Sequence, residues 1–125
     1  DWGYAKDYVV GMHKILQADS SDTFVLSTGR TKTIREFLAL AFKQVDIDIE
    51  FSGEGEKEVA INKSSGKIVS KVNSKYYRPA EVDLLIGDAS KAKNKLGWEA
   101  TTSLEELCKL MVEADLKRVL SGSSN

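Results

Sequence analysis

A chain of 125 residues, 42% hydrophobic and 30% charged, has room for one domain built around one core. Its formal net charge is −1, with acids and bases interspersed, which argues against nucleic acid or an anionic membrane surface as a partner. No apolar run approaches the ~20 residues of a membrane span, and one cysteine with one histidine allows neither an internal disulfide nor a His/Cys metal cluster, so we expect no metal and a cytoplasmic location.

The first predicted element is a helix over residues 5–17, where apolar side chains recur every three or four positions. His13 falls between its core positions with no carboxylate or nucleophile placed to orient it, so we favour a structural or exposed histidine over a catalytic base. Residues 23–27 then predict a short strand buried on both faces.

A glycine-containing turn, Thr28-Gly29-Arg30, follows that strand and precedes a second helix. Thr33 and Glu36 have the spacing of a capping box, which predicts the start of this helix. The turn is either a simple connection or a place where an anion or a ribose meets unpaired backbone N–H groups.

Three short strands are predicted next, at residues 47–51, 59–61 and 68–72, the last two joined by a hairpin turn at residues 63–66. The surrounding glutamates favour a solvated face over paired catalytic carboxylates. Such a hairpin has too little apolar area to be stable alone, so we expect it to pack on another element or another subunit.

The stretch of residues 76–87 contains the only proline, Pro79. Proline restricts both its own backbone and that of the preceding residue, so Arg78 is presented from a stiff, extended turn, with Glu81 three residues later. A guanidinium beside a carboxylate suits a ligand with an anionic group next to a diol, such as a nucleotide. The alternative is that Arg78 and Glu81 pair with each other or with a neighbouring segment.

Residues 83–86 predict a further short strand, after which Asp88 is expected to cap a helix that ends at Gly97. Trp98 is expected to pack back onto that helix. A second capping box, Ser103 with Glu106, opens the last helix.

Catalytic motifs are missing from the sequence. Cys108 lies inside the last predicted helix and has the pattern of a core or boundary residue rather than a reactive thiol. There is no glycine-rich dinucleotide or phosphate motif, and a single histidine cannot build a catalytic triad. We therefore expect this chain to recognise a substrate while another part of a longer protein carries out the reaction.

Four stretches in order, at residues 1–9, 76–83, 87–98 and 111–116, resemble the C-terminal part of the GDP-mannose 4,6-dehydratase family, within the extended short-chain dehydrogenase/reductase superfamily. The opening Asp-Trp-Gly-Tyr-Ala-Lys-Asp-Tyr-Val is the narrow signature. The later Gly-Asp, Ser-Lys-Ala and Leu-Gly-Trp stretches are shared across the superfamily.

The resemblance implies an NADP-dependent lyase that oxidises C4 of GDP-mannose, eliminates water across C5 and C6 and returns the hydride to C6. The product, GDP-4-keto-6-deoxymannose, is a precursor of GDP-fucose and related deoxysugars. NADP and the catalytic residues belong to an N-terminal Rossmann domain that is absent here, so this chain has no catalytic or cofactor-binding residue and should be inactive alone. The family also forms homodimers and homotetramers.

Carried over by position, Arg78 matches an arginine that clamps the diphosphate, Glu81 an acid that binds the ribose hydroxyls, and Trp2 a residue that lines the nucleotide pocket. The arginine that the family has just before the position of Asp1 is not in this chain. A sister nucleotide-sugar reductase or 4-epimerase, or a non-catalytic nucleotide-sugar-binding module, are the alternatives.

The predicted fold is of the α/β class, as one α+β-type substrate domain over residues 1–125. It combines small mixed sheets with three or four helices.

Overall fold

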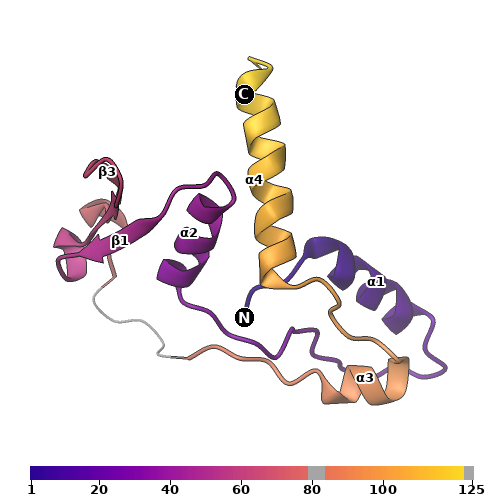
Figure 1. Cartoon of the computed structure of the whole chain (residues 1–125). Coiled ribbons are helices and arrows are strands. Elements are labelled where there is room, and N and C mark those ends of the chain that lie inside the picture. Colours follow the sequence, from indigo (N-terminus) through magenta and orange to yellow (C-terminus); the bar gives the residue numbers. More distant parts are fainter. Residues whose placement is uncertain (79–83, 123–125) are drawn as a thin grey trace. The chain divides into compact units, whose positions relative to one another are not determined.

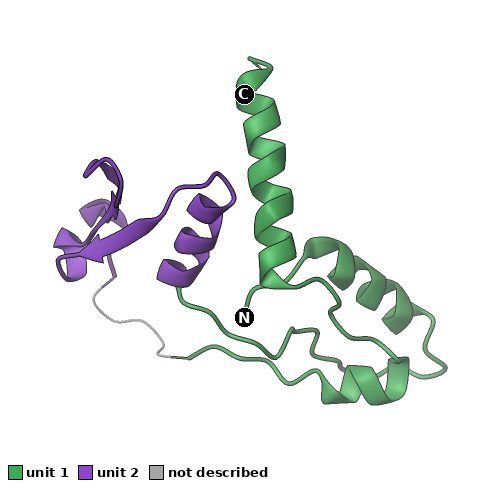
Figure 2. Ribbon diagram, viewed as in Figure 1, with its two compact units in different colours: residues 1–33, 84–125 green, residues 34–83 purple. Residues whose placement is uncertain are grey.

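The computed structural model describes residues 1–78 and 84–122 (Figure 1). The chain divides into two compact units, Asp1–Thr33 with Leu84–Asn125 as unit 1 and Ile34–Asp83 as unit 2 (Figure 2). Within these described ranges, four α-helices, two short 3-10 helices and one three-stranded sheet confirm the mixed helix and strand content. Whether the two units act as a single nucleotide-sugar-binding domain stays a prediction.

Unit 1 contains the helices α1 (Ala5–Leu16), α3 (Ser90–Leu96) and α4 (Leu104–Leu120) (Figure 1). The predicted helix ending at Gly97 is confirmed, since this glycine takes the left-handed conformation at φ 58° that commonly terminates helices. Lys14 of α1 donates to the carbonyl oxygens of Leu96 at 3.1 Å and of Gly97 at 2.8 Å. A cation thus satisfies the carbonyls at the end of α3, where the helix dipole favours positive charge.

The core of unit 1 forms around Trp98, whose side chain is 2% exposed. Its indole N–H donates to the backbone oxygen of Asp7 at 2.8 Å, and its ring lies 6.0 Å from that of Tyr8. Gly11 leaves the space for this contact, because a Cβ there would lie 3.0 Å from the indole. The indole therefore packs on α1, where it finds the hydrogen-bond acceptor that a buried indole needs. The predicted packing of the Trp98 ring on the helix before it stays a prediction.

The segment after Trp98 is also attached to α1. The Asp7 carboxylate accepts hydrogen bonds from Thr102 N at 2.9 Å and from Thr101 Oγ1 at 3.3 Å. Partial burial opposes ionisation of Asp7, but these hydrogen bonds outweigh it and lower its pKa. An ionised Asp7 thus holds the connection between α3 and α4 against α1.

Two predicted strands are not found among the described residues. Neither residues 23–27 nor the described part of residues 83–86 belongs to a sheet in the described ranges. The segments nevertheless approach closely, because a Cβ on Gly87 would lie 2.5 Å from Ser27 Cβ. Apolar runs predict burial, but a strand also needs a neighbour for its backbone hydrogen bonds, and residues 1–78 and 84–122 supply none.

The first turns of α3 and α4, for which the sequence predicts capping residues, are each stabilised by side-chain hydrogen bonds. The capping box of α4 is confirmed, with Ser103 and Glu106 satisfying each other's backbone N–H groups. For α3 the N-cap position is Ala89, and the predicted cap, Asp88, lies one residue earlier, where it accepts from Ser90 N at 2.9 Å. Asp88 therefore stabilises the first turn by an Asx-type bond.

Unit 2 consists of α2 (Ile34–Lys43) and a small sheet. Its strands, β1 (Ile49–Ser52), β2 (Val59–Asn62) and β3 (Ile68–Lys71), pair in the order β1-β2-β3, and all described pairings are antiparallel. The prediction of mixed sheets is wrong because the short connections between these strands allow antiparallel neighbours only.

The predicted hairpin between β2 and β3 is confirmed. The Asn62 side chain accepts from Ser64 N at 2.9 Å and Ser65 N at 3.1 Å, which builds the turn. α2 begins directly after Thr33, as its capping-box pattern predicts.

Candidate functional site

The three predicted ligand-binding residues are distributed over the described and undescribed parts of the chain. Trp2 belongs to unit 1, where it is 38% exposed. Arg78 belongs to unit 2 and is exposed. Glu81 and Pro79 lie outside the described residues, so the ribose contact and the stiff turn stay predictions.

The backbone leading to Arg78 is shaped by local hydrogen bonds and ring contacts. The short 3-10 helix η2 (Ser74–Tyr76) is capped by Asn73, whose side chain accepts from Lys75 N at 3.0 Å. The next residue, Tyr77, has its hydroxyl 3.4 Å from where a Cβ on Gly55 would lie. Arg78 therefore follows an ordered turn rather than a free linker.

Trp2 is held by its indole N–H, which donates to Lys32 O at 3.0 Å. A small hollow of about 160 Å³ opens beside it, lined by Trp2, Thr28, Arg30, Lys32, Leu104 and Glu105. An aromatic face beside two cations is a favourable environment for a flat or phosphate-bearing anion. Sequence reasoning selected Trp2 and named Arg30 only as part of the Thr28-Gly29-Arg30 turn. It missed Lys32, which belongs to no motif.

The Thr28-Gly29 turn already holds an anion, and that anion is the carboxylate of Asp1. Its Oδ1 accepts from Thr28 N at 2.9 Å and Thr28 Oγ1 at 2.6 Å, and its Oδ2 accepts from Gly29 N at 2.9 Å and Gly87 N at 3.4 Å. Of the two interpretations of this turn, the one in which its backbone N–H groups receive an external anion or ribose does not hold for Thr28 and Gly29, because the chain supplies the acceptor itself.

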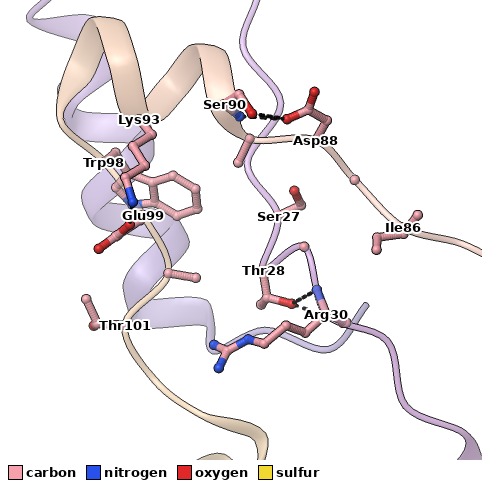
Figure 3. A pocket seen from close by; sticks show the side chains of 14 residues that line it. Ser27, Thr28, Arg30, Ile86, Asp88, Ser90, Lys93, Trp98, Glu99 and Thr101 are labelled. Atoms are coloured by element: carbon pink, nitrogen blue, oxygen red, sulfur yellow. Dashed lines mark hydrogen bonds and ion pairs between the residues drawn. The ribbon is translucent and has the colours of Figure 1, made fainter.

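A larger, open hollow of about 900 Å³ also lies in unit 1 (Figure 3). Residues 27–30, residues 86–90, Lys93 and residues 98–101 line it. Its walls come from segments far apart in the sequence, so no local motif could have revealed it. The buried hydroxyl of Ser27 is among its lining groups and has no described hydrogen-bond partner.

The lining of this hollow carries charges of both signs. Lys93 and Glu99 form an ion pair at 2.5 Å, and the lysine lowers the pKa of Glu99 (Figure 3). The hydroxyl and amide of Ser90 lower the pKa of Asp88. Both carboxylates are therefore ionised at neutral pH, and Arg30 contributes a further cation.

Groups that could carry out catalysis are not assembled in the described residues. His13 is exposed. Cys108 is fully buried, and burial raises the pKa of its thiol, which keeps it protonated at neutral pH. Across residues 1–78 and 84–122 no group of three or more His, Cys, Asp or Glu could hold a metal ion, and no helix is long and apolar enough to cross a membrane.

NADP, which the family resemblance implies, does not fit the residues present. A dinucleotide cradle needs a parallel strand leading through a glycine-rich turn into a helix. The described sheet is antiparallel, and the N–H groups of the Thr28-Gly29 turn are already bound by Asp1. No step of a reaction is therefore assigned to NADP on this chain.

A family model described as GDP-mannose 4,6 dehydratase matches residues 1–111. The chain belongs to the GDP-mannose 4,6-dehydratase family.

Curated relatives agree along nearly the whole chain. A GDP-mannose 4,6 dehydratase of Dictyostelium discoideum is 46% identical over 98% of this chain and 34% of its own length. Relatives of the same name from Yersinia enterocolitica and Homo sapiens are each 44% identical over 94% of this chain, covering 34% and 32% of their own lengths. The chain thus spans about a third of these relatives.

Proposed function

We propose that the protein containing this chain is a lyase that converts GDP-mannose to GDP-4-keto-6-deoxymannose, and that this chain is its substrate-binding part. The observation that carries the proposal is the family match over residues 1–111. The polar and charged hollows of unit 1 support a binding role for this portion.

Within this proposal, Arg78 binds the diphosphate of GDP-mannose, Glu81 binds the ribose hydroxyls, and Trp2 lines the nucleotide pocket. The exposure of Arg78 after an ordered turn supports its role, since a presented guanidinium binds phosphate oxygens through two parallel N–H bonds. Trp2 lines the same hollow as Arg30 and Lys32. These two cations favour the binding of an anionic group beside the indole ring.

The remaining parts of the proposal concern the whole protein. It uses NADP bound to an N-terminal Rossmann domain of the extended short-chain dehydrogenase/reductase type, works as a homodimer or homotetramer, and acts in the cytoplasm on the path to GDP-fucose or a related deoxysugar. The free, buried thiol of Cys108 suits a reducing compartment.

Product analysis tests the reaction. The intact protein that contains this chain is incubated with GDP-mannose and NADP, and the sugar nucleotide formed is identified by mass and NMR. GDP-4-keto-6-deoxymannose is the expected product. A 4-epimer or a reduced deoxysugar would replace the proposal by a sister enzyme, and binding without any conversion would leave a non-catalytic binding module.

Calorimetry of Arg78→Ala in the same intact protein tests the binding role. Loss of a charge-assisted bidentate contact should weaken GDP-mannose binding about tenfold or more. Arg118→Ala is the matched control, because Arg118 pairs with Asp115 on the exposed surface of α4. Unchanged affinity in Arg78→Ala would refute the assignment. The 125-residue chain alone should neither bind NADP nor turn over substrate.

A further inference from the structure

The turn formed by residues 28–32 of unit 1 is attached at both ends to the first two residues of the chain. At one end, the Asp1 carboxylate accepts from Thr28 N, Thr28 Oγ1 and Gly29 N at 2.9, 2.6 and 2.9 Å. At the other end, the Trp2 indole donates to Lys32 O at 3.0 Å. The 28–32 turn and residues 1–2 therefore form one ordered unit.

Arg30 lies between these two attachments. Its backbone N–H donates to Thr28 Oγ1 at 3.2 Å, and its side chain lines the large hollow (Figure 3). The same side chain also lines the small hollow beside Trp2. In the described part of the chain no carboxylate forms an ion pair with the guanidinium, although Glu105 lines the same small hollow. The guanidinium is thus available to a ligand, and the hydrogen bonds at both ends of the turn restrict the backbone that carries it.

We propose that Arg30 is a phosphate-binding residue of unit 1 and that Asp1 is the positioning residue that holds it in place. This inference rests on the proposed function. A guanidinium presents two parallel N–H donors that match phosphate oxygens. Trp2 adds an aromatic face and Lys32 a second cation. The negative charge of Asp1 is satisfied by the backbone and hydroxyl donors of the turn, so we assign it no contact with the ligand.

The first test measures the Kd and KM of the intact protein for GDP-mannose with Arg30→Gln. Removal of the guanidinium should weaken binding about tenfold or more, and KM should rise while kcat is retained. The loss should be largest at low ionic strength, because partly exposed charges are screened by salt. Arg118→Gln makes the same chemical change on α4 away from both hollows and should leave Kd and KM unaltered.

The second test separates a positioning role of Asp1 from a merely structural one. Asp1→Asn keeps the shape of the side chain but replaces one carboxylate oxygen by an NH₂ group, which cannot accept a hydrogen bond from Thr28 N or Gly29 N. The turn should therefore loosen, and KM should rise several-fold. If Asp1 acts through Arg30, then Asp1→Asn has no further effect on KM in an Arg30→Gln background. Asp19→Asn, an exposed change in the same unit, is the matched control. Additive effects of Asp1→Asn and Arg30→Gln would overturn the positioning role.

A third measurement distinguishes failure of this inference from failure of the proposed function. The ¹⁵N-labelled 125-residue chain is titrated with inorganic pyrophosphate. The Trp2 indole and Arg30 signals are expected to shift in the native sequence, and the Trp2 indole signal is expected not to shift in Arg30→Gln. Absence of these shifts overturns the phosphate role of Arg30. If the intact protein binds GDP-mannose through Arg78 while Arg30→Gln binds within twofold of the native protein, the inference is wrong and the proposed function stands.

Discussion

Replacing Gly11 by alanine should destabilise unit 1, although the same change in an exposed helix would stabilise it. Alanine is favoured over glycine in a helix by about 1 kcal/mol. At this position, however, the new Cβ would lie 2.7 Å from Leu26 Cδ1 and 3.0 Å from the Trp98 indole. Overpacking of this kind costs about 1–3 kcal/mol.

The packing cost should exceed the helix gain because Trp98 cannot move away. Its indole is buried and bound to the Asp7 carbonyl oxygen at 2.8 Å, whereas the end of the Leu26 side chain can rotate. We therefore expect a net loss of about 1 kcal/mol in the free energy of unfolding, as the difference between the two opposing effects.

Urea denaturation followed by tryptophan fluorescence measures this loss for Gly11→Ala. A double-mutant cycle with Leu26→Ala provides the control, because removal of Leu26 Cδ1 opens space and should reduce the penalty of Gly11→Ala. If Gly11→Ala alone stabilises the chain by about the helix-propensity value of 1 kcal/mol, the argument for close packing at this glycine is refuted.

Three other positions give independent predictions. Gly97→Ala should lower the free energy of unfolding by about 1–2 kcal/mol, because φ is 58° and a side chain disfavours this conformation; urea denaturation measures it. The Cys108 thiol, buried and with a raised pKa, should react with Ellman's reagent only as fast as the chain opens, and rapid labelling of the folded protein would contradict its burial. Lys91 and Lys95 lower the pKa of Asp22 below its ordinary value of 3.8, so its stabilising contribution is complete above that pH and is lost as pH falls through the lowered pKa. Asp22→Asn should therefore lower the melting temperature more at pH 7 than near pH 2, where part of the contribution is already lost. An equal effect at both pH values would exclude these ion pairs as the cause.

The candidate site illustrates how far local sequence patterns reach. Trp2 and Arg78 were selectable from motif resemblance, and the structure shows both with exposed side chains. The position of Arg30 and Lys32 beside Trp2 was not predicted, because they become neighbours of Trp2 only when the 28–32 turn is attached to the start of the chain. The same attachment decides between the two interpretations of the turn, because Asp1, which is distant in sequence, occupies the N–H groups that an external anion would need.

Secondary structure that depends on neighbouring residues was determined by the sequence itself. The capping box of α4, the left-handed Gly97 at the end of α3 and the hairpin after Asn62 each require groups only a few residues apart. Their hydrogen bonds form within one turn of chain, so residue type and spacing suffice to predict them.

Tertiary structure decided the features that join distant segments. Trp98 packs on α1 because its acceptor is the Asp7 carbonyl, and residues 23–27 and 84–86 stay outside a sheet because the described chain offers their backbones no partner strand. Apolar content indicates that a segment will be buried, but only the folded chain determines which hydrogen-bond partner it meets.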